Sequence, residues 1–270
     1  MTRSSEAPIG IFDSGIGGLT VARAVKNELP NEQLIYFGDT AHLPYGDKST
    51  AAIQAYSIKI TQELLNRSCK LILIACNSAS AAAYELVREY VGKSAKVLNV
   101  IDPVVDYLRE RYEQKTVGLI GTKQTVNSEV YDQKVQALNR GIKLKALATP
   151  LLVPLIEEGF FTGDISQTII KKYLEDPWLQ DLTALILGCT HYPLIKHSVR
   201  KFYGPTVEVI DSSELVARAL KGYLEFNNLV NGNGGGEDFF MVSDFTDSFQ
   251  HSTKLFFGER VRLERSTLWD

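Results

Sequence analysis

Two cysteines occupy matching places in the sequence and are the first candidates for chemistry. Cys76 ends an apolar run that begins at Lys70, and Cys189 closely follows one that begins at Ala184. A helix-like segment follows each, so each thiol is expected near the positive end of a helix dipole, which favours the thiolate. Two thiols on opposite faces of a carbon centre could remove a proton from one face and deliver one to the other. Cys69 precedes its apolar run and has no counterpart, which makes it an internal comparison.

Polar residues near the two thiols could serve the same chemistry. Asn77 or Ser78 is expected to cap the helix after the first thiol, and Thr190 the helix after the second. Unpaired N–H groups at such helix starts can hold a carboxylate. His191 could tune the second thiol or act as an acid, although a lone histidine is more often a packed residue. Asp13 could pair with a substrate ammonium group or steer a thiol's proton, or it could simply bond its own backbone in a turn.

Short apolar runs alternate with amphipathic segments, and these elements must position the candidate residues. The runs predict strands at residues 8–12, 33–37, 70–76, 96–101, 115–120, 143–148, 184–187, 207–210 and 239–243. Apolar side chains at helical spacing predict helices at residues 19–29, 50–66, 78–91, 128–139, 164–174, 194–203 and 247–257. Strands that alternate with helices in this way predict an α/β fold with mostly parallel sheets.

The sequence also repeats itself weakly. Residues 9–12 resemble 117–120, residues 73–78 resemble 186–191, and residues 100–102 resemble 209–211. This order predicts two similar, pseudo-symmetric α/β domains, although all α/β units share some strand-turn-helix pattern. We place the first domain at 1–98 plus 210–270 and the second at 99–209. The carboxyl ends of their strands would then face a shared cleft, where α/β proteins bind ligands.

The composition excludes several classes of protein. The chain has 270 residues, 29 Lys and Arg against 32 Asp and Glu, a net charge of −3 and 44% hydrophobic residues. These values are typical of globular proteins and argue against disorder or a dedicated nucleic-acid binder. No apolar stretch is long enough for a membrane helix, and the first eight residues carry no apolar leader, so we expect a cytoplasmic protein. Three cysteines without a C-x-x-C pair do not suggest a disulfide framework or a zinc finger.

The glycine loop at residues 13–18 offers a competing interpretation as a dinucleotide site. Gly15 and Gly17 fit the first two glycines of that motif, and Asp39 could bind a ribose. Thr20 stands where the third glycine should be, and the acidic residue at the start of the loop would repel a pyrophosphate. A nucleotide-dependent oxidoreductase is therefore disfavoured. No phosphate loop, metal-ligand cluster or marked Schiff-base lysine is evident, so no cofactor and no metal are predicted.

Four motifs in order, at residues 13–19, 36–46, 75–80 and 187–194, resemble the glutamate racemase family. The resemblance extends to residues 210–212 and 242–244 and so spans nearly the whole chain. It implies two α/β domains with the active site between them. It also implies an isomerase that interconverts L- and D-glutamate without a cofactor, supplies D-glutamate for peptidoglycan, and works as a cytoplasmic homodimer.

The same resemblance implies roles for particular residues. Cys76 and Cys189 would be the two acid/base thiols, with Cys189 taking the α-proton from L-glutamate and Cys76 from D-glutamate. Asp13 would assist Cys76, and Glu157 and His191 would assist Cys189. The substrate contacts would be Asp13, Ser14, Tyr45, Gly46, Asn77, Ser78, Thr122, Thr125, Thr190 and His191.

Two details and two alternatives stay open at this point. Glu158 lies beside Glu157, so either could be the functional carboxylate, and Ser78 stands where the family usually has Thr. An aspartate or broader amino-acid racemase is the nearest alternative function. A non-catalytic protein that closes on an acidic metabolite is the alternative from another class, and it would leave the α-proton in place.

Overall fold

The protein folds into two parallel β-sheets flanked by helices, which confirms the predicted α/β class. The computed structural model describes residues 4–270, so the first three positions of the predicted first domain lie outside the description. The strands are β1 (Ile9–Asp13), β2 (Leu34–Gly38), β3 (Leu71–Ile74), β4 (Lys96–Asn99), β5 (Thr116–Gly121), β6 (Lys143–Ala148), β7 (Ala184–Gly188), β8 (Glu208–Asp211), β9 (Phe239–Val242) and β10 (Leu263–Arg265). One sheet has the order β10-β9-β2-β1-β3-β4, and the other has the order β6-β5-β7-β8.

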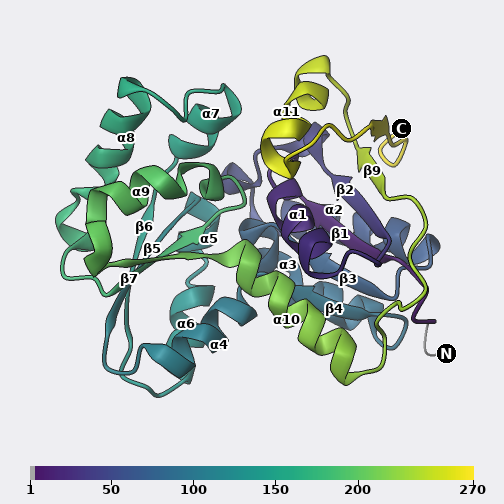
Figure 1. The fold of residues 1–270 in the computed structure, drawn as a ribbon, viewed down its shortest axis with the longest axis horizontal. Helices are drawn as coiled ribbons and strands as arrows, with labels where there is room; N and C mark the ends of the chain where they lie inside the picture. Colours follow the sequence, from purple (N-terminus) through teal and green to yellow (C-terminus); the bar gives the residue numbers. More distant parts are fainter. Residues whose placement is uncertain (1–3) are drawn as a thin grey trace.

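Helices cover both sheets. They are α1 (Leu19–Glu28), α2 (Thr50–Asn66), α3 (Asn77–Val91), α4 (Asp102–Arg111), α5 (Lys123–Asn127), α6 (Val130–Ala137), α7 (Leu152–Glu157), α8 (Asp164–Leu174), α9 (Lys196–Tyr203), α10 (Ser212–Phe226) and α11 (Asp247–Phe257). Figure 1 shows the two sheets side by side, with α10 at the boundary, where it packs against α1 and α4. Among the described residues, none of the helices is long and apolar enough to cross a membrane.

The two sheets share one topology. Four consecutive strands of the larger sheet, β2-β1-β3-β4, have the same order as β6-β5-β7-β8. Phe12 of β1 pairs with Ile74 of β3, and Ile120 of β5 pairs with Leu187 of β7. These registers match two of the sequence repeats, residues 9–12 with 117–120 and residues 73–78 with 186–191. The predicted relation between two α/β halves is therefore confirmed at these strands.

The third sequence repeat was assigned wrongly. Ile74 pairs with Asn99, whereas Leu187 pairs with Asp211, so Asn99 is the structural equivalent of Asp211. Residues 100–102 lie beyond β4, at the start of α4. Asn99 Oδ1 accepts the N–H groups of residues 101 and 102, and Asp211 Oδ1 accepts that of Ser213 at 3.0 Å. Both side chains thus end a strand and start a helix, a role that the two residue types can share.

The structure also corrects several predicted helices. The predicted helix at 128–139 is present as α6 but begins only at Val130, because Glu129 takes a left-handed conformation with φ of 55°. The predicted helix at 194–203 starts as a 3-10 turn, η4 (Tyr192–Ile195), and continues as α9. Helices α4, α5, α7 and α10 and strand β10 lie outside the predicted elements.

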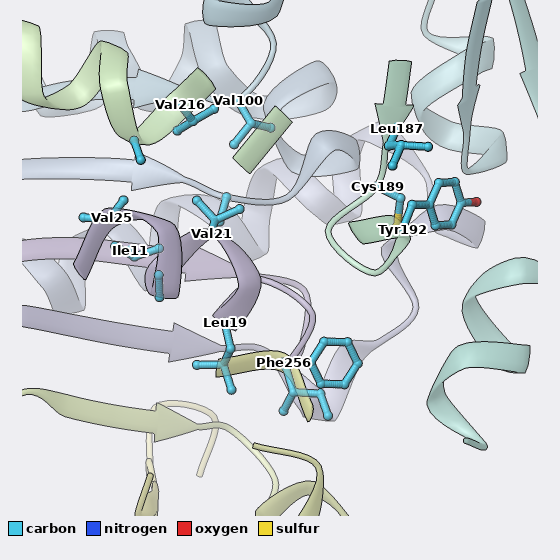
Figure 2. Close-up of a cluster of buried hydrophobic side chains, with 14 of the residues drawn as sticks. Ile11, Leu19, Val21, Val25, Val100, Leu187, Cys189, Tyr192, Val216 and Phe256 are labelled. Carbon is cyan, nitrogen blue, oxygen red and sulfur yellow. The ribbon is translucent and has the colours of Figure 1, made fainter. Parts of the chain in front are cut away.

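An apolar cluster spans both halves and reaches the second thiol. Figure 2 shows Leu19 of α1 beside Phe256 of α11, and Cys189 beside Tyr192 of η4. These four side chains are at least 94% buried and belong to one contiguous core. His191, two residues after Cys189, meets the ring of Phe256 edge-on at 5.3 Å between centroids, so the loop that carries Cys189 packs against the other half of the molecule.

Candidate active site

One pocket lies at the carboxyl ends of the strands of both sheets, the edge where parallel α/β sheets bind ligands. All but two of the predicted site residues line it. Those that line it are Ser14, Tyr45, Gly46, Cys76, Asn77, Ser78, Thr122, Glu157, Cys189, Thr190 and His191. The two exceptions, Asp13 and Thr125, are buried beside residues of the lining, at 0% and 1% exposure.

Cys76 itself caps the first helix, so the expected caps, Asn77 and Ser78, are wrong. Its Sγ accepts the N–H of Ala79 at 3.5 Å, while Asn77 is the first residue of α3. A side chain at the cap position can reach the N–H three residues on, and here that side chain is the thiol. Cys76 Sγ also lies 3.7 Å from the hydroxyl of Ser14.

The environment of Cys76 favours the protonated thiol. Burial and the charge of Asp13 raise its pKa to about 12, although the Ala79 N–H acts in the opposite direction. Loss of solvation thus opposes the helix terminus, which by itself would favour the thiolate, and outweighs it. Cys76 is placed to donate a proton.

Asp13 supplies a buried carboxylate behind this thiol. Its Oδ2 accepts the N–H groups of Gly15 at 3.1 Å and Gly18 at 2.9 Å. Its Oδ1 is buried and has no hydrogen-bond partner among residues 4–270. Burial raises the pKa of Asp13. One oxygen thus bonds the turn, as the simpler interpretation expected, while the other is left for a proton or an ammonium group.

The second thiol lies at the start of a relay of three side chains. Cys189 Sγ is 3.7 Å from His191 Nδ1, and His191 Nε2 is 2.9 Å from Glu157 Oε1. Burial would lower the pKa of His191, but its bonds to Cys189 and Glu157 outweigh burial and raise the pKa to about 10. The imidazolium form can donate one N–H to each neighbour. The site therefore holds a cation against the Cys189 sulfur.

Glu157, rather than Glu158, makes the contact with the histidine. Glu157 ends α7 with its carboxylate at His191, whereas Glu158 is exposed beyond the end of that helix. Thr190 does not cap a helix, contrary to expectation. The element that follows is the short turn η4, and the residue at its cap position is His191. Its hydroxyl lies 3.4 Å from His191 Nδ1 instead.

Three hydroxyls form a polar wall at another side of the pocket. The Ser78 hydroxyl lies 2.9 Å from that of Thr122 and 3.4 Å from that of Thr125, and the two threonine hydroxyls are 3.0 Å apart. Thr125 is the innermost of the three. Gly46 meets this wall closely, since a Cβ there would lie 2.9 Å from the Cβ of Thr122. Hydroxyls of this kind suit a carboxylate ligand.

Several lining residues were missed by the sequence reasoning. Thr149 directly follows β6, and Val153 lies in the first turn of α7. Lys123 also lines the pocket, and its Nζ pairs with Asp47 at 3.1 Å. The position of Thr149 at a strand's carboxyl end was the one signal available, because ligands gather at that edge.

The fold and the site define an enzyme class in which two related α/β halves each supply one thiol to a shared pocket. The Asp/Glu/Hydantoin racemase family model matches residues 19–220. The glutamate racemase of Chlorobaculum parvum is 39% identical over 259 residues, covering 96% of this chain and 95% of the relative. That of Thermus thermophilus is 40% identical over 263 residues, covering 97% of each.

Solved structures agree with the sequence relatives. The crystal structure of glutamate racemase from Francisella tularensis in complex with D-glutamate superposes with a TM-score of 0.90. It is 38% identical and covers 98% of this chain and 99% of its own. The chain therefore belongs to the Asp/Glu/Hydantoin racemase family, and the resemblance found in the motifs is confirmed.

Proposed function

We propose that this chain interconverts L- and D-glutamate by proton transfer between two thiols, and so supplies D-glutamate for peptidoglycan. The observation that carries the proposal is the placement of Cys76 and Cys189 two residues beyond paired, equivalent strand positions, in the lining of one pocket. The glutamate racemases among its relatives, and the one solved with D-glutamate, support the choice of substrate.

The forward reaction starts from the thiolate of Cys189. The imidazolium of His191 stabilises this thiolate, and Glu157 holds the imidazolium in its charged form. The thiolate removes the α-proton of L-glutamate and leaves a carbanion whose charge the α-carboxylate shares. Cys76, protonated because burial raises its pKa to about 12, then donates its proton to the opposite face. D-glutamate leaves, with Cys189 as thiol and Cys76 as thiolate.

The reverse reaction needs the thiolate of Cys76, and Asp13 is the group that can help to form it. Its Oδ1 has no partner among residues 4–270 and lies close enough for its charge to raise the pKa of Cys76. Because burial raises the pKa of Asp13, the carboxyl can take up a proton from the thiol. His191 has the matching role for Cys189.

The pocket offers donors for both carboxylates of glutamate. The hydroxyls of Ser78 and Thr122 and the N–H groups at the start of the turn η2 (Tyr45–Asp47) lie on one side. Ser14 and Thr190 lie beside the two thiols and can bind the α-carboxylate. Ser78 stands where the family usually has Thr, and it keeps the hydroxyl, which lies 2.9 Å from that of Thr122.

Alanine replacement of each cysteine tests the proposal. Cys76→Ala and Cys189→Ala should each reduce racemisation of L-glutamate to background, because each removes the acid/base group of one face. Cys69→Ala is the control, since Cys69 lies against Gly10 at the amino end of β3 and outside the pocket lining. Circular dichroism follows the rate without added cofactor. Full activity in either of the first two variants, or faster turnover of L-aspartate, would reject the proposal.

The proposal includes the arrangement of the protein. The two sheets agree with domains at 1–98 plus 210–270 and at 99–209 except at the boundaries, because β4 (Lys96–Asn99) lies wholly in the larger sheet and β8 (Glu208–Asp211) wholly in the smaller one. A cytoplasmic location is supported by thiol chemistry, which needs reduced cysteines, and no disulfide is formed within residues 4–270. A homodimer is supported by the family resemblance, and light scattering coupled to size-exclusion chromatography tests it.

A further inference from the structure

A buried carboxylate behind the pocket joins the substrate-binding turn to the segment that follows β10. Asp39 directly follows β2 and is 0% exposed. Its Oδ1 accepts the Ser243 hydroxyl at 2.8 Å and Trp269 Nε1 at 2.9 Å, and its Oδ2 accepts the Tyr45 hydroxyl at 2.6 Å. His42 Nδ1 lies 3.0 Å from both oxygens. Four segments thus meet at one carboxylate, which leaves Asp39 no role in binding a ribose.

Tyr45 connects Asp39 to the pocket, because its hydroxyl donates to Asp39 and the residue lines the pocket. Tyr45 and Gly46 open η2, and the first N–H groups of a helical turn have no partner within the turn. Both residues line the pocket, and Gly46 lies close against Thr122, which follows β5 of the other sheet. Burial and the charge of Asp39 raise the pKa of Tyr45, so its hydroxyl remains a neutral donor to Asp39. The bond to Asp39 therefore fixes the turn that carries these N–H groups.

Two aromatic rings and one lysine surround Trp269, whose indole N–H donates to Asp39. Its ring meets His42 edge-on at 4.6 Å between centroids and Tyr56 at 5.7 Å. Lys59 Nζ lies 4.4 Å from the centre of the ring. The backbone N–H of Ser266 bonds to the end of β9 at 2.8 Å, which anchors the turn that carries Trp269. An indole held on several sides in this way presents its N–H to Asp39 in one direction.

We propose that Trp269 is a positioning residue for substrate binding, acting through Asp39 on the turn of Tyr45 and Gly46. The inference rests on the proposed function, because glutamate is the ligand whose carboxylate that turn would hold. A turn that holds the substrate equally before and during proton transfer affects binding and not the chemical step. Loss of the Trp269 N–H should therefore raise KM and leave kcat nearly unchanged.

Kinetics of Trp269→Phe test this directly, since Phe keeps a ring but removes the N–H. We expect KM for L-glutamate to rise about tenfold or more, as for loss of one hydrogen bond to a charged acceptor, with kcat within about twofold. Ser243→Ala removes a second donor to the same oxygen and should act in the same direction. Trp178→Phe is the matched control, because Trp178 is 54% exposed and outside the pocket lining.

Fluorescence gives a second readout that a merely structural role would not change. The protein has two tryptophans, so Trp178→Phe leaves Trp269 as the single indole fluorophore. Titration of that variant with racemic glutamate should change the emission of Trp269 with a midpoint close to KM. Trp269→Phe, which keeps Trp178, should show no glutamate-dependent change.

The outcomes separate this inference from the proposed function. Wild-type turnover of glutamate with an unchanged KM in Trp269→Phe would overturn the positioning role alone. Emission from Trp269 that does not change at saturating glutamate would also overturn the positioning role alone. A fall in kcat at constant KM would indicate loss of folded protein and would also overturn it. Absence of glutamate turnover by the wild-type protein would remove the proposed function and this inference with it.

Discussion

Replacing Glu157 by Gln keeps the shape of the side chain but removes the charge beside His191. Glu157 Oε1 accepts the Nε2 proton at 2.9 Å, and this bond is one of the two that raise the pKa of His191 to about 10. A hydrogen bond to a charged group contributes about 1.5–3 kcal/mol. The Glu157 side chain is 29% exposed, so solvent screening places the loss near the lower value, about 1.5 kcal/mol.

This loss has two measurable consequences. A change of about 1.5 kcal/mol lowers the pKa of His191 by roughly one unit and kcat/KM by roughly tenfold. Because the two enantiomers have equal free energies in water, kcat/KM must fall equally for both. The imidazolium persists below its pKa and is lost as the pH rises through about 10 in the wild type. The alkaline limit of activity should therefore move down by roughly one pH unit in the variant.

Racemisation rates of both enantiomers between neutral and alkaline pH, followed by circular dichroism, measure both effects. Glu158→Gln is the matched control, since Glu158 is exposed and its removal should leave the rate and the profile unchanged. Glu157→Gln with kcat/KM within twofold of wild type and an unmoved alkaline limit would refute the relay. The same loss in Glu158→Gln instead would assign the role to the neighbour.

Three further substitutions test packing at the site, packing away from it and a buried ion pair. Gly17→Ala would place a Cβ 2.4 Å from His191 Cε1, so kcat/KM should fall about tenfold, as overpacking by 1–3 kcal/mol implies. Gly222→Ala, on open helix surface, should keep activity and raise Tm slightly, and equal activities of the two variants would contradict the packing argument. Glu32→Ala would leave the buried Lys70 ammonium unpaired and lower the free energy of unfolding by about 3–5 kcal/mol. Urea denaturation measures this, and an unchanged midpoint would show that the ion pair does not stabilise the fold.

The sequence could predict the two thiols because their signal is local. Each follows an apolar strand by two residues or fewer, and the registers of Ile74 and Leu187 place them at equivalent points. Helix α10 was also readable in principle, since Val216, Leu220 and Leu224 are buried at helical spacing. Its omission is a missed pattern rather than a physical limit.

Contacts between distant segments could not be read from the sequence. Glu157 and His191 are 34 positions apart, and Asp39 and Trp269 are 230 apart, so no local pattern connects them. The raised pKa of Cys76 also could not be predicted from the sequence. Its helix position favours the thiolate, whereas the depth of burial that raises its pKa is a property of the packed molecule.

Deuterium incorporation during turnover tests the central claim, that the two thiols act on opposite faces. L-glutamate is incubated with the enzyme in D₂O and stopped early, the enantiomers are separated, and proton NMR measures the α-position of each. We expect the D-glutamate formed to carry deuterium while the remaining L-glutamate keeps its proton, because Cys189 removes the proton and Cys76 delivers the deuteron. Deuterium entering the remaining L-glutamate as fast as D-glutamate forms would show that one base serves both faces, and would contradict the account.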